Sequence, residues 1–308
     1  MECIKDSIRI KGKEKEVDRY RIFDKDIIVK GNMLKIAQLK HEYFDDLYDP
    51  EEVIREMAEN NLEADLFTFW QRLPNIEQKF NYYKEFDSLA VLRIKSYDDW
   101  FKHSIDSYTR NRARQAGKRG VLVDVAEYKD DFVNGIVNIY KETPIRQGKP
   151  FWHYEKSFSQ VKKETSDALD KSIFIGAYYN KQLIGFAKLL MAEQYAMMVL
   201  ILSMIAHRDK SIPNALIAKA VEVCSNNDKK YLVYAKWDVN KSLAEFKINN
   251  GFEVFKLPRY FIPLTIKGSY ALKCHLHRGI SPLVPEKIKY FLNIIRVKQA
   301  KWKYNIKQ

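Results

Sequence analysis

The chain has 308 residues, enough for two domains of ordinary size, and 46% of them are hydrophobic, which is sufficient for a buried core. No stretch reaches the roughly 18 apolar residues of a membrane-spanning helix, and the charged N-terminus lacks the apolar centre of a signal peptide. We therefore expect a cytoplasmic protein with no membrane span. Three cysteines far apart in the sequence indicate neither a disulfide framework nor a zinc site.

The formal charge of +13 lies mainly in two segments, residues 102–119 and the C-terminal tail. At helical spacing the first segment has two basic faces, with Arg110, Arg114 and Lys118 on one and Arg112 and Arg119 on the other. In the tail, seven lysines and arginines are opposed only by Glu286. Nucleic acid, anionic cell-envelope substrates or solubility alone would each account for such patches.

Residues 1–100 alternate short strand-like runs with turns and predict an N-terminal α/β unit. Strands are expected at 19–23, 26–31, 33–39, 64–71 and 88–94. Between them, Asp49-Pro50 opens a helix that ends near Asn60, because proline is favoured in the first turn and acids follow it there.

A basic helix is predicted over 98–117, and after it the elements follow the order β-α-α-β-β-β-α-β-α-β-β. They are expected at 121–126, 130–143, 157–169, 172–179, 182–192, 195–206, 211 onward, 231–237, 242–249, 252–256 and 260–265. Beyond them, residues 274–277 alternate like a strand. The tail helix from Pro285 is expected to pack back on the body through Ile288, Phe291, Leu292 and Ile295.

The stretch from Tyr195 to Cys224 is the one around which the second half is organised. An uncharged run over 195–206 predicts a buried strand, a basic turn follows, and Ser211 is expected to cap the next helix. Such a turn directs backbone N–H groups and the positive end of a helix dipole at one spot, which favours a phosphate-bearing ligand. The alternative is an ordinary capped helix whose basic residues face water.

This order of elements resembles, over residues 121–265, the GNAT fold of N-acyltransferases. The acyl-CoA motif of that family falls on Arg208 to Pro213, and Asn240, Ala244, Phe246 and Gly251-Phe252 match a later family segment. The basic segment from Tyr108, with the helix that ends near Thr143, resembles the FemABX branch. In that branch two GNAT-like halves lie in tandem and transfer an amino acid from aminoacyl-tRNA to a peptidoglycan precursor.

The resemblance implies an α/β fold of the α+β type, with a mixed, largely antiparallel sheet flanked by helices and two GNAT-like halves in tandem. The expected division is an N-terminal half at 1–100, a basic connecting helix at 101–120, an acyltransferase domain at 121–268, and a strand plus basic helix at 269–308.

The donor site implied by the resemblance lies around the turn after the fourth strand. Its expected contacts are Met204, Ile205, Ala206, Arg208, Asp209, Lys210, Ser211, Ile212, Asn214, Ala215 and Asn240. Two positions depart from the family motif, since Ser211 and Pro213 stand where glycines let backbone amides approach a pyrophosphate. Proline has no N–H, and losing one hydrogen bond to a charged group, about 1.5–3 kcal/mol, would weaken a CoA complex about 10- to 100-fold.

The catalytic candidates lie near the point where the fourth and fifth strands of a GNAT fold diverge. Acyl transfer needs a neutral amine, a donor for the tetrahedral oxyanion and a proton for the leaving group. Glu193 and Asp238 are the candidate bases, with Tyr234 nearby, and Lys247 stands where many family members have a tyrosine that protonates the leaving thiolate. Each residue also has a structural interpretation, as a turn residue, a helix cap or a core side chain.

The loop from Glu142 to Tyr154 has two prolines, a glycine, three adjacent aromatic rings and two cations. This composition suits ligand binding, so Arg146, Trp152, His153 and Tyr154 are the candidate acceptor-binding residues. The alternative is a loop held over the core by its aromatic side chains. The six histidines show no convincing metal-ligand spacing, and no metal is expected.

The sequence therefore predicts an N-acyltransferase that moves an acyl group from acetyl-CoA or another acyl-CoA to a small-molecule or peptide amine through a tetrahedral intermediate. One alternative is a FemABX-like aminoacyltransferase with tRNA as a partner. The other is a non-catalytic GNAT-fold module that binds nucleic acid or an anionic partner.

Overall fold

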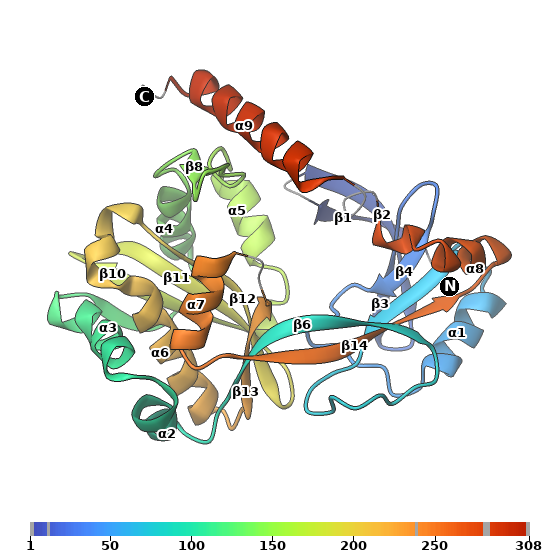
Figure 1. Ribbon diagram of the computed structural model, residues 1–308, viewed down its shortest axis with the longest axis horizontal. Coiled ribbons are helices and arrows are strands. Elements are labelled where there is room, and N and C mark those ends of the chain that lie inside the picture. Colours follow the sequence, from blue (N-terminus) through green and yellow to red (C-terminus); the bar gives the residue numbers. More distant parts are fainter. Residues whose placement is uncertain (1–2, 11–12, 238–239, 280–283, 306–308) are drawn as a thin grey trace. The chain divides into compact units, whose positions relative to one another are not determined.

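The computed structural model describes residues 3–10, 13–237, 240–279 and 284–305. The chain forms two compact units, one of Met1–Asp87 with Leu257–Gln308 and the other of Ser88–Lys256. It leaves the first unit within β6 (Tyr83–Arg93) and returns within β14 (Glu253–Pro263). The second unit is thus inserted into the first, and it already begins before the basic helix (Figure 1).

The strands of the first unit follow the order β1-β2-β3-β4-β5-β14. They are β1 Cys3–Ile10, β2 Lys13–Ile22, β3 Lys25–Lys30, β4 Ile36–Leu39 and β5 Leu66–Trp70. Only β4 and β5 pair in parallel, and the other neighbours are antiparallel. Of these strands, β1 is missing from the prediction, because Lys5, Asp6 and Ser7 interrupt both a regular alternation and a continuous apolar run.

Helix α1 (Pro50–Glu59) begins and ends where the sequence predicts. The Asp49 carboxylate accepts hydrogen bonds from the amides of Glu51 and Glu52, and Pro50 occupies the first turn. Val53 and Met57, one helical turn apart, are buried. They share a core with Phe67 and Phe69 from β5, which fixes the helix against the sheet of this unit.

The end of the first unit differs from the prediction at residues 269–308. Cys274 ends helix α8 (Ile266–Lys273), and a left-handed His275 (φ 55°) leads into a short 3₁₀ turn, Leu276–Arg278, so the predicted strand is wrong. Helix α9 (Glu286–Lys303) forms as predicted. The face predicted to pack on the body, with Ile288, Phe291, Leu292 and Ile295, is exposed, so that packing is wrong; Ala300 is the buried residue of the helix.

The sheet of the second unit has the order β6-β13-β12-β11-β10-β7. Its further strands are β7 Leu122–Ala126, β10 Ser172–Tyr179, β11 Gln182–Met191, β12 Tyr195–Ser203 and β13 Tyr231–Lys236. The predicted meander β10-β11-β12 is antiparallel, whereas β12 and β13 are parallel. That parallel pairing covers only Tyr195–Met197 against Tyr231–Val233, after which the two strands diverge.

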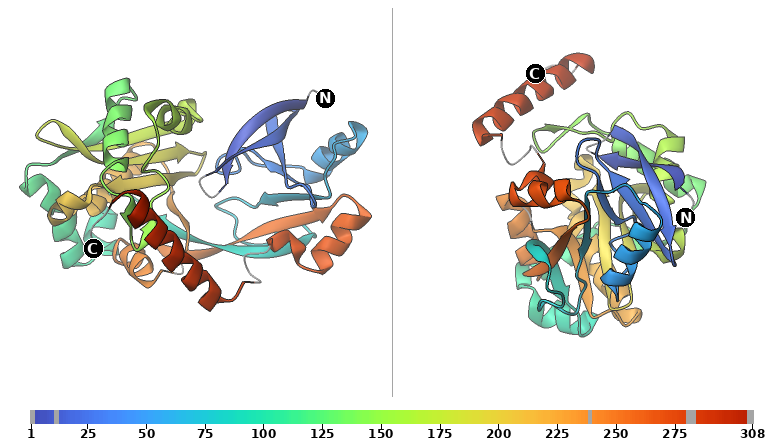
Figure 2. Two further views of the ribbon diagram at one scale, coloured as in Figure 1. Left: turned by 90° about the horizontal axis from the view of Figure 1, so that it is seen from above. Right: turned by 90° about the vertical axis from the view of Figure 1, so that its right-hand side faces the viewer.

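Helices cover both faces of this second sheet. They are α2 Tyr97–Asp99, α3 Ser107–Lys118, α4 Asp130–Tyr140, α5 Phe158–Thr165, α6 Ile212–Asn226 and α7 Lys241–Asn249. Successive residues of β11 show the two faces, since Phe186 contacts Phe132 of α4 while Gly185 faces Ile212 of α6. Figure 2 shows α4 and α6 on opposite sides of the strands.

The predicted helix at 98–117 is interrupted. Trp100–Ser104 forms a π-helical turn, and the Asp106 side chain then caps α3 by accepting from the Thr109 amide. Trp100 explains the break, because its buried indole donates a hydrogen bond of 3.0 Å to the Asn250 carbonyl. Apart from this break, the arrangement confirms the predicted fold class, a mixed, mostly antiparallel sheet flanked by helices. No helix in the described ranges is both long and apolar enough to cross a bilayer.

Gly251 ends α7 and offers a test of the predicted Asn250-Gly251 stop. Its φ is +86°, and an added Cβ would lie 3.1 Å from Leu92 Cδ1 and 3.2 Å from the Ser104 carbonyl oxygen. We expect Gly251→Ala to lower the free energy of unfolding by about 1–3 kcal/mol, measured by urea denaturation. The control is Gly117→Ala in α3, where a Cβ meets nothing within 4 Å and should be neutral or stabilising. Equal effects of the two changes would contradict this interpretation.

Lys188 in β11 predicts a pH dependence of stability. Its buried Nζ donates to the carbonyls of Thr165 (2.9 Å) and Asp167 (2.6 Å), and burial lowers the pKa of Lys188 from 10.5 to about 8. Between these two pKa values the unfolded chain holds a proton that the folded chain has released. The free energy of unfolding should therefore rise with pH from about 8 to 10.5. Lys188→Met should make this slope shallower; identical slopes in urea titrations would show that Lys188 does not titrate in this way.

Candidate functional site

A cleft of about 460 Å³ opens in the second unit where β12 and β13 diverge. Its walls come from α3, the loop after α4, the end of β12, the start of α6 and α7. Three arginines line it, Arg112, Arg146 and Arg208, together with a single carboxylate among the described lining residues, Glu245. The predicted donor and acceptor regions therefore meet at one basic cleft.

Glu142 is not one of the described lining residues, but it binds the backbone of residues at the edge of the cleft. Two residues after α4, its carboxylate accepts hydrogen bonds from the Ile205 amide (2.7 Å) and the Ala206 amide (2.8 Å), which follow the end of β12. The carboxylate also lies 3.9 Å from Arg146 Nη2 and is mostly buried. A carboxylate with two N–H donors and a neighbouring guanidinium is a strongly held group, because charge-assisted hydrogen bonds are roughly twice as strong as neutral ones.

The predicted donor amides are thus already engaged within the chain. The Met204 amide donates to the Ile184 carbonyl of β11 at 2.8 Å, and the Ile205 and Ala206 amides donate to Glu142. In this arrangement none of the three is available to an acyl donor. That these residues contact an acyl donor stays a prediction; the structure shows that an acid of the chain binds the Ile205 and Ala206 amides.

Ser211 occupies the N-cap position of α6, as predicted, but its side chain makes no capping hydrogen bond. Its backbone is left-handed (φ 53°), and its hydroxyl accepts from Arg112 Nη1 and donates to Gln115 Oε1, each at 2.9 Å. Pro213 follows within the first turn of α6, and the Asn214 amide donates to the Ser211 carbonyl at 3.1 Å. The turn therefore presents few backbone donors to a ligand, and the side chains of α3 replace them.

The second basic face of α3 holds this turn in place. Besides the Arg112 contact, Gln115 Nε2 donates to the Asp209 carbonyl at 2.7 Å, and Arg119 pairs with the Asp209 carboxylate at 2.7 Å. The larger basic face is partly committed elsewhere, because Arg110 donates to carbonyls at the end of the preceding π turn and Arg114 lies over the Phe101 ring. Only the face with Arg112 reaches the cleft.

Arg146 at the cleft is mostly buried and lies near a second guanidinium, that of Arg208. Arg146 Nη2 donates to the Ser203 carbonyl, and its side chain is 14% exposed. Burial lowers the pKa of Arg146 below its ordinary value, Glu142 opposes this effect, and the nearby Arg208 adds to it. An anion bound between Arg146 and Arg208 would relieve that repulsion, so the cleft favours anionic ligands.

The aromatic loop after α4 mostly folds over the core, as the alternative interpretation held. His153 is buried beside the Tyr140 ring, and its Nδ1 lies 2.8 Å from the Nζ of buried Lys156, which also pairs with Glu164. Trp152, 53% exposed, lies over that lysine. Of the predicted acceptor residues only Arg146 lines the cleft; Trp152, His153 and Tyr154 are not among its described lining residues.

Three of the four catalytic candidates, Glu193, Tyr234 and Lys247, are not among the described lining residues of the cleft. Glu193 lies before β12, at the end opposite Ser203, and is exposed. Lys247 is buried, donates to the Lys236 carbonyl at 2.7 Å and lies over the Tyr234 ring. Neither Lys247 nor Tyr234 is among the described lining residues, and Asp238 lies outside the described residues.

The predicted donor set divides in the same way. Met204, Ile205, Arg208, Ser211 and Asn214 line the cleft. The other residues of the predicted donor set have structural positions. Asn240 accepts from the Ser242 amide and caps α7, and Asp209 pairs with Lys210. Ile212 and Ala215 are buried, and the Ala206 amide donates to the Glu142 carboxylate.

Sequence reasoning missed Glu142, Gln115 and Asn250 as residues of the site. Asn250 is fully buried, and its Oδ1 accepts from Asn214 Nδ2 at 3.2 Å, which joins the end of α7 to the start of α6. The spacing of Arg112, Gln115 and Arg119 on one helical face was a usable signal. The sequence gives no such signal for Glu142, because the amides that it binds are 63 and 64 residues away along the chain.

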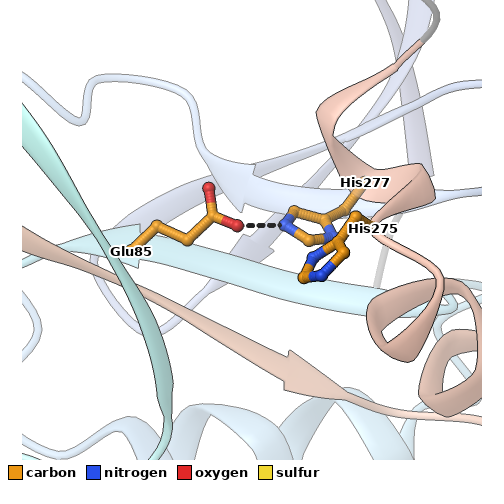
Figure 3. A group of neighbouring side chains, drawn as sticks. All are labelled: Glu85, His275 and His277. Carbon is orange, nitrogen blue, oxygen red and sulfur yellow. Dashed lines mark hydrogen bonds and ion pairs between the residues drawn. The ribbon is translucent and has the colours of Figure 1, made fainter. Parts of the chain in front are cut away.

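A separate cluster in the first unit was also missed, formed by Glu85, His275 and His277. Figure 3 shows Glu85 reaching from β6 to His277, with His275 beside it. One ligand atom from each residue lies within 4.8 Å of the others, so the set could hold a metal ion. However, Glu85 Oε1 accepts from His277 Nε2 at 2.7 Å and from Arg278 Nε at 2.9 Å. Ligands of a tetrahedral ion with bonds of about 2.1 Å lie about 3.4 Å apart, so the present arrangement is a hydrogen-bonded ion pair.

Comparison with known proteins identifies structures that share the fold of this chain. No family model matches the sequence, and no curated protein matches it. A structure of FemX superposes with a TM-score of 0.56 at 10% identity, over 83% of this chain and 87% of that one. The C-terminal domain of a putative lysylphosphatidylglycerol synthetase from Agrobacterium fabrum gives 0.55 at 15% identity, over 85% and 88%. L-PGS from Bacillus licheniformis gives 0.54 at 12%, over 84% and 87%. The predicted FemABX-like fold is therefore confirmed.

Glu142→Gln tests the bond between the carboxylate and the two amides. A glutamine side chain keeps one acceptor oxygen but turns an NH₂ group toward the second amide. We expect the free energy of unfolding to fall by about 1–2 kcal/mol, since one amide loses its acceptor but water can reach it. Glu127→Gln is the control, because exposed Glu127 pairs only at the surface, with Lys129, and should change stability by less than about 1 kcal/mol. A neutral Glu142→Gln in urea denaturation would contradict this assignment.

Proposed function

We propose that the protein is an acyl-group transferase that moves an aminoacyl group from tRNA to an amine. The observation that carries the proposal is the Glu142 carboxylate on the Ile205 and Ala206 amides, next to a cleft lined by three arginines. Because these backbone amides are already engaged, the site must bind an anionic acyl donor through side chains. Arginine suits the phosphates of an RNA terminus, because its fork of donors matches two phosphate oxygens.

The same observation argues against CoA held in the manner of the GNAT family. A pyrophosphate approaching these amides would have to displace a carboxylate that accepts two hydrogen bonds, and the like charge of Glu142 would repel it. Pro213 removes a further N–H from the turn. RNA does not depend on this backbone cradle, since guanidinium groups and stacking rings can hold its phosphates and bases. Arg112 and exposed Tyr108 supply both kinds of contact at the rim.

The proposed chemistry is direct attack of a neutral amine on the ester carbonyl of the aminoacyl end. The C–N bond forms, the C–O bond to the ribose breaks, and the proton of the amine passes to the leaving ribose oxygen. The donor for the tetrahedral oxyanion is the Arg112 guanidinium, which lines the cleft and is held at its wall by the Ser211 hydroxyl. Glu245 is the described lining carboxylate able to hold the ammonium form of the acceptor.

The similar structures support the class of reaction proposed. One of them is named a putative lysylphosphatidylglycerol synthetase, so its printed product joins an amino acid to an acceptor, and another is named FemX. The likeness of fold makes an aminoacyl group a natural choice for the moiety transferred here. We propose that the acceptor is the amine of a small molecule or a peptide.

Acyl-CoA remains the second candidate donor, because Arg208 occupies the first position of the family's acyl-CoA motif and lines the cleft. Binding by this route requires Glu142 to release the two amides. The second candidate therefore predicts that Glu142→Ala raises CoA affinity, whereas the tRNA proposal does not need Glu142 to move.

Binding measurements separate the donors. A fluorescent acceptor-stem RNA ending in CCA should bind with strong salt dependence, and Arg112→Ala or Arg208→Ala should weaken binding about 10- to 100-fold, as expected for a lost charged hydrogen bond of about 1.5–3 kcal/mol. Arg114→Ala is the matched control on α3, because Arg114 contacts Phe101 and not the cleft. Anisotropy titrations give the affinities.

A transfer assay completes the test, with labelled aminoacyl-tRNA and a mixture of amines and peptides as acceptors. Salt-sensitive RNA binding that needs Arg112, without any acyl transfer, would favour the non-catalytic module. CoA binding at micromolar concentration with no RNA binding would favour the second candidate donor and overturn the proposal.

A further inference from the structure

Helix α9 of the first unit exposes apolar side chains along its length. Among the described residues of the chain, few other segments expose so many large apolar groups so close together. Their exposed fractions are 49% for Ile288, 61% for Phe291, 41% for Leu292, 36% for Ile295 and 85% for Trp302. A helix that closed the core would bury these groups, and an exposed apolar face of this size is typical of a binding surface.

The exposed residues form one continuous stripe. With about 100° between successive helical residues, Ile288, Phe291, Leu292, Ile295 and Trp302 fall within an arc of about 100°. On the opposite side, Val297 is half-buried and Ala300 is 9% exposed. Tyr290, 70% exposed, lies outside this arc, so the stripe is the most apolar face of a helix that is exposed on other sides as well.

Cations border this apolar stripe on both sides. Helical spacing places Lys287 and Lys298 along one border, and Arg296 and Lys303 along the other. The helix contains six lysines and arginines and a single acid, Glu286, which pairs with Lys289. Long basic side chains at the edge of an apolar face can extend their charged ends away from it.

We propose that α9 binds the surface of an anionic lipid bilayer, lying in the plane of the headgroups. The apolar stripe would enter the boundary with the acyl chains, and the bordering cations would contact anionic headgroups. At about 1.5 Å per residue, its 18 residues extend about 27 Å, long enough to place both Ile288 and Trp302 in the interface. Its six lysines and arginines fit a helix that lies on a bilayer and not one that spans it.

The arrangement favours lipid over nucleic acid as the partner of this face. A helix that binds RNA presents cations at the centre of its contact surface, where they meet phosphates. Here apolar side chains occupy the centre and the cations lie at the borders, which is the pattern of interfacial helices. The proposal concerns α9 alone and holds whichever donor the cleft binds.

Co-sedimentation with vesicles tests the proposal on the full chain. We expect binding to vesicles of phosphatidylcholine with 30% phosphatidylglycerol, and at least tenfold weaker binding to pure phosphatidylcholine or in high salt. Phe291→Ser with Ile295→Ser should reduce binding at least tenfold, as should Arg296→Gln with Lys298→Gln. The matched control is Ile266→Ser with Leu276→Ser, two exposed apolar residues of the same unit that lie outside α9.

Fluorescence places the helix in the bilayer directly. Trp302 is the tryptophan of α9, so the emission difference between the protein and its Trp302→Phe variant should shift to shorter wavelength on anionic vesicles and be quenched by brominated lipids. The variants at 291 and 295 should abolish the shift, and circular dichroism confirms that they remain folded. The proposal is overturned if the full chain fails to bind anionic vesicles, if the control pair weakens binding as much as the α9 pairs, or if α9 binds RNA and no lipid.

Discussion

The pairing of the Glu142 carboxylate with the Ile205 and Ala206 amides is the interaction on which the cleft depends. It arises where β12 has lost its neighbour β13, so two backbone donors at the strand end need an acceptor. The acid that satisfies them also holds Arg146 at the edge of the cleft. One carboxylate therefore closes the backbone to an anionic donor and leaves guanidinium groups as the means of binding it.

The role of α3 follows from the same constraint. The turn before α6 offers few backbone donors, since Ser211 is left-handed and Pro213 has no N–H. Arg112 and Gln115 hold the Ser211 hydroxyl and the Asp209 carbonyl, so the basic helix is part of the site and not a detached surface patch. A positive helix joined to a motif whose backbone amides are engaged is consistent with an RNA-borne donor.

Much of the fold could be predicted from the sequence, because apolar runs and turn residues mark the strands of the β10-β11-β12 meander and the start of α1. The errors have physical causes: Trp100 interrupts a helix to bond the distant Asn250, and α9 turns its largest apolar residues outward, which periodicity alone does not reveal. For the site, the turn and Arg146 were predictable from motif and composition. Glu142 was not, because its effect comes from contacts between elements far apart in the sequence.

The amide signals of Ile205 and Ala206, followed by NMR during titration with CoA, test the central claim most directly. If Glu142 holds both amides, their chemical shifts stay unchanged up to millimolar CoA, and a CCA-terminated acceptor stem perturbs the arginine side-chain signals of the cleft. Saturable shifts of both amides at micromolar CoA, with release of the Glu142 carboxylate, would contradict the account.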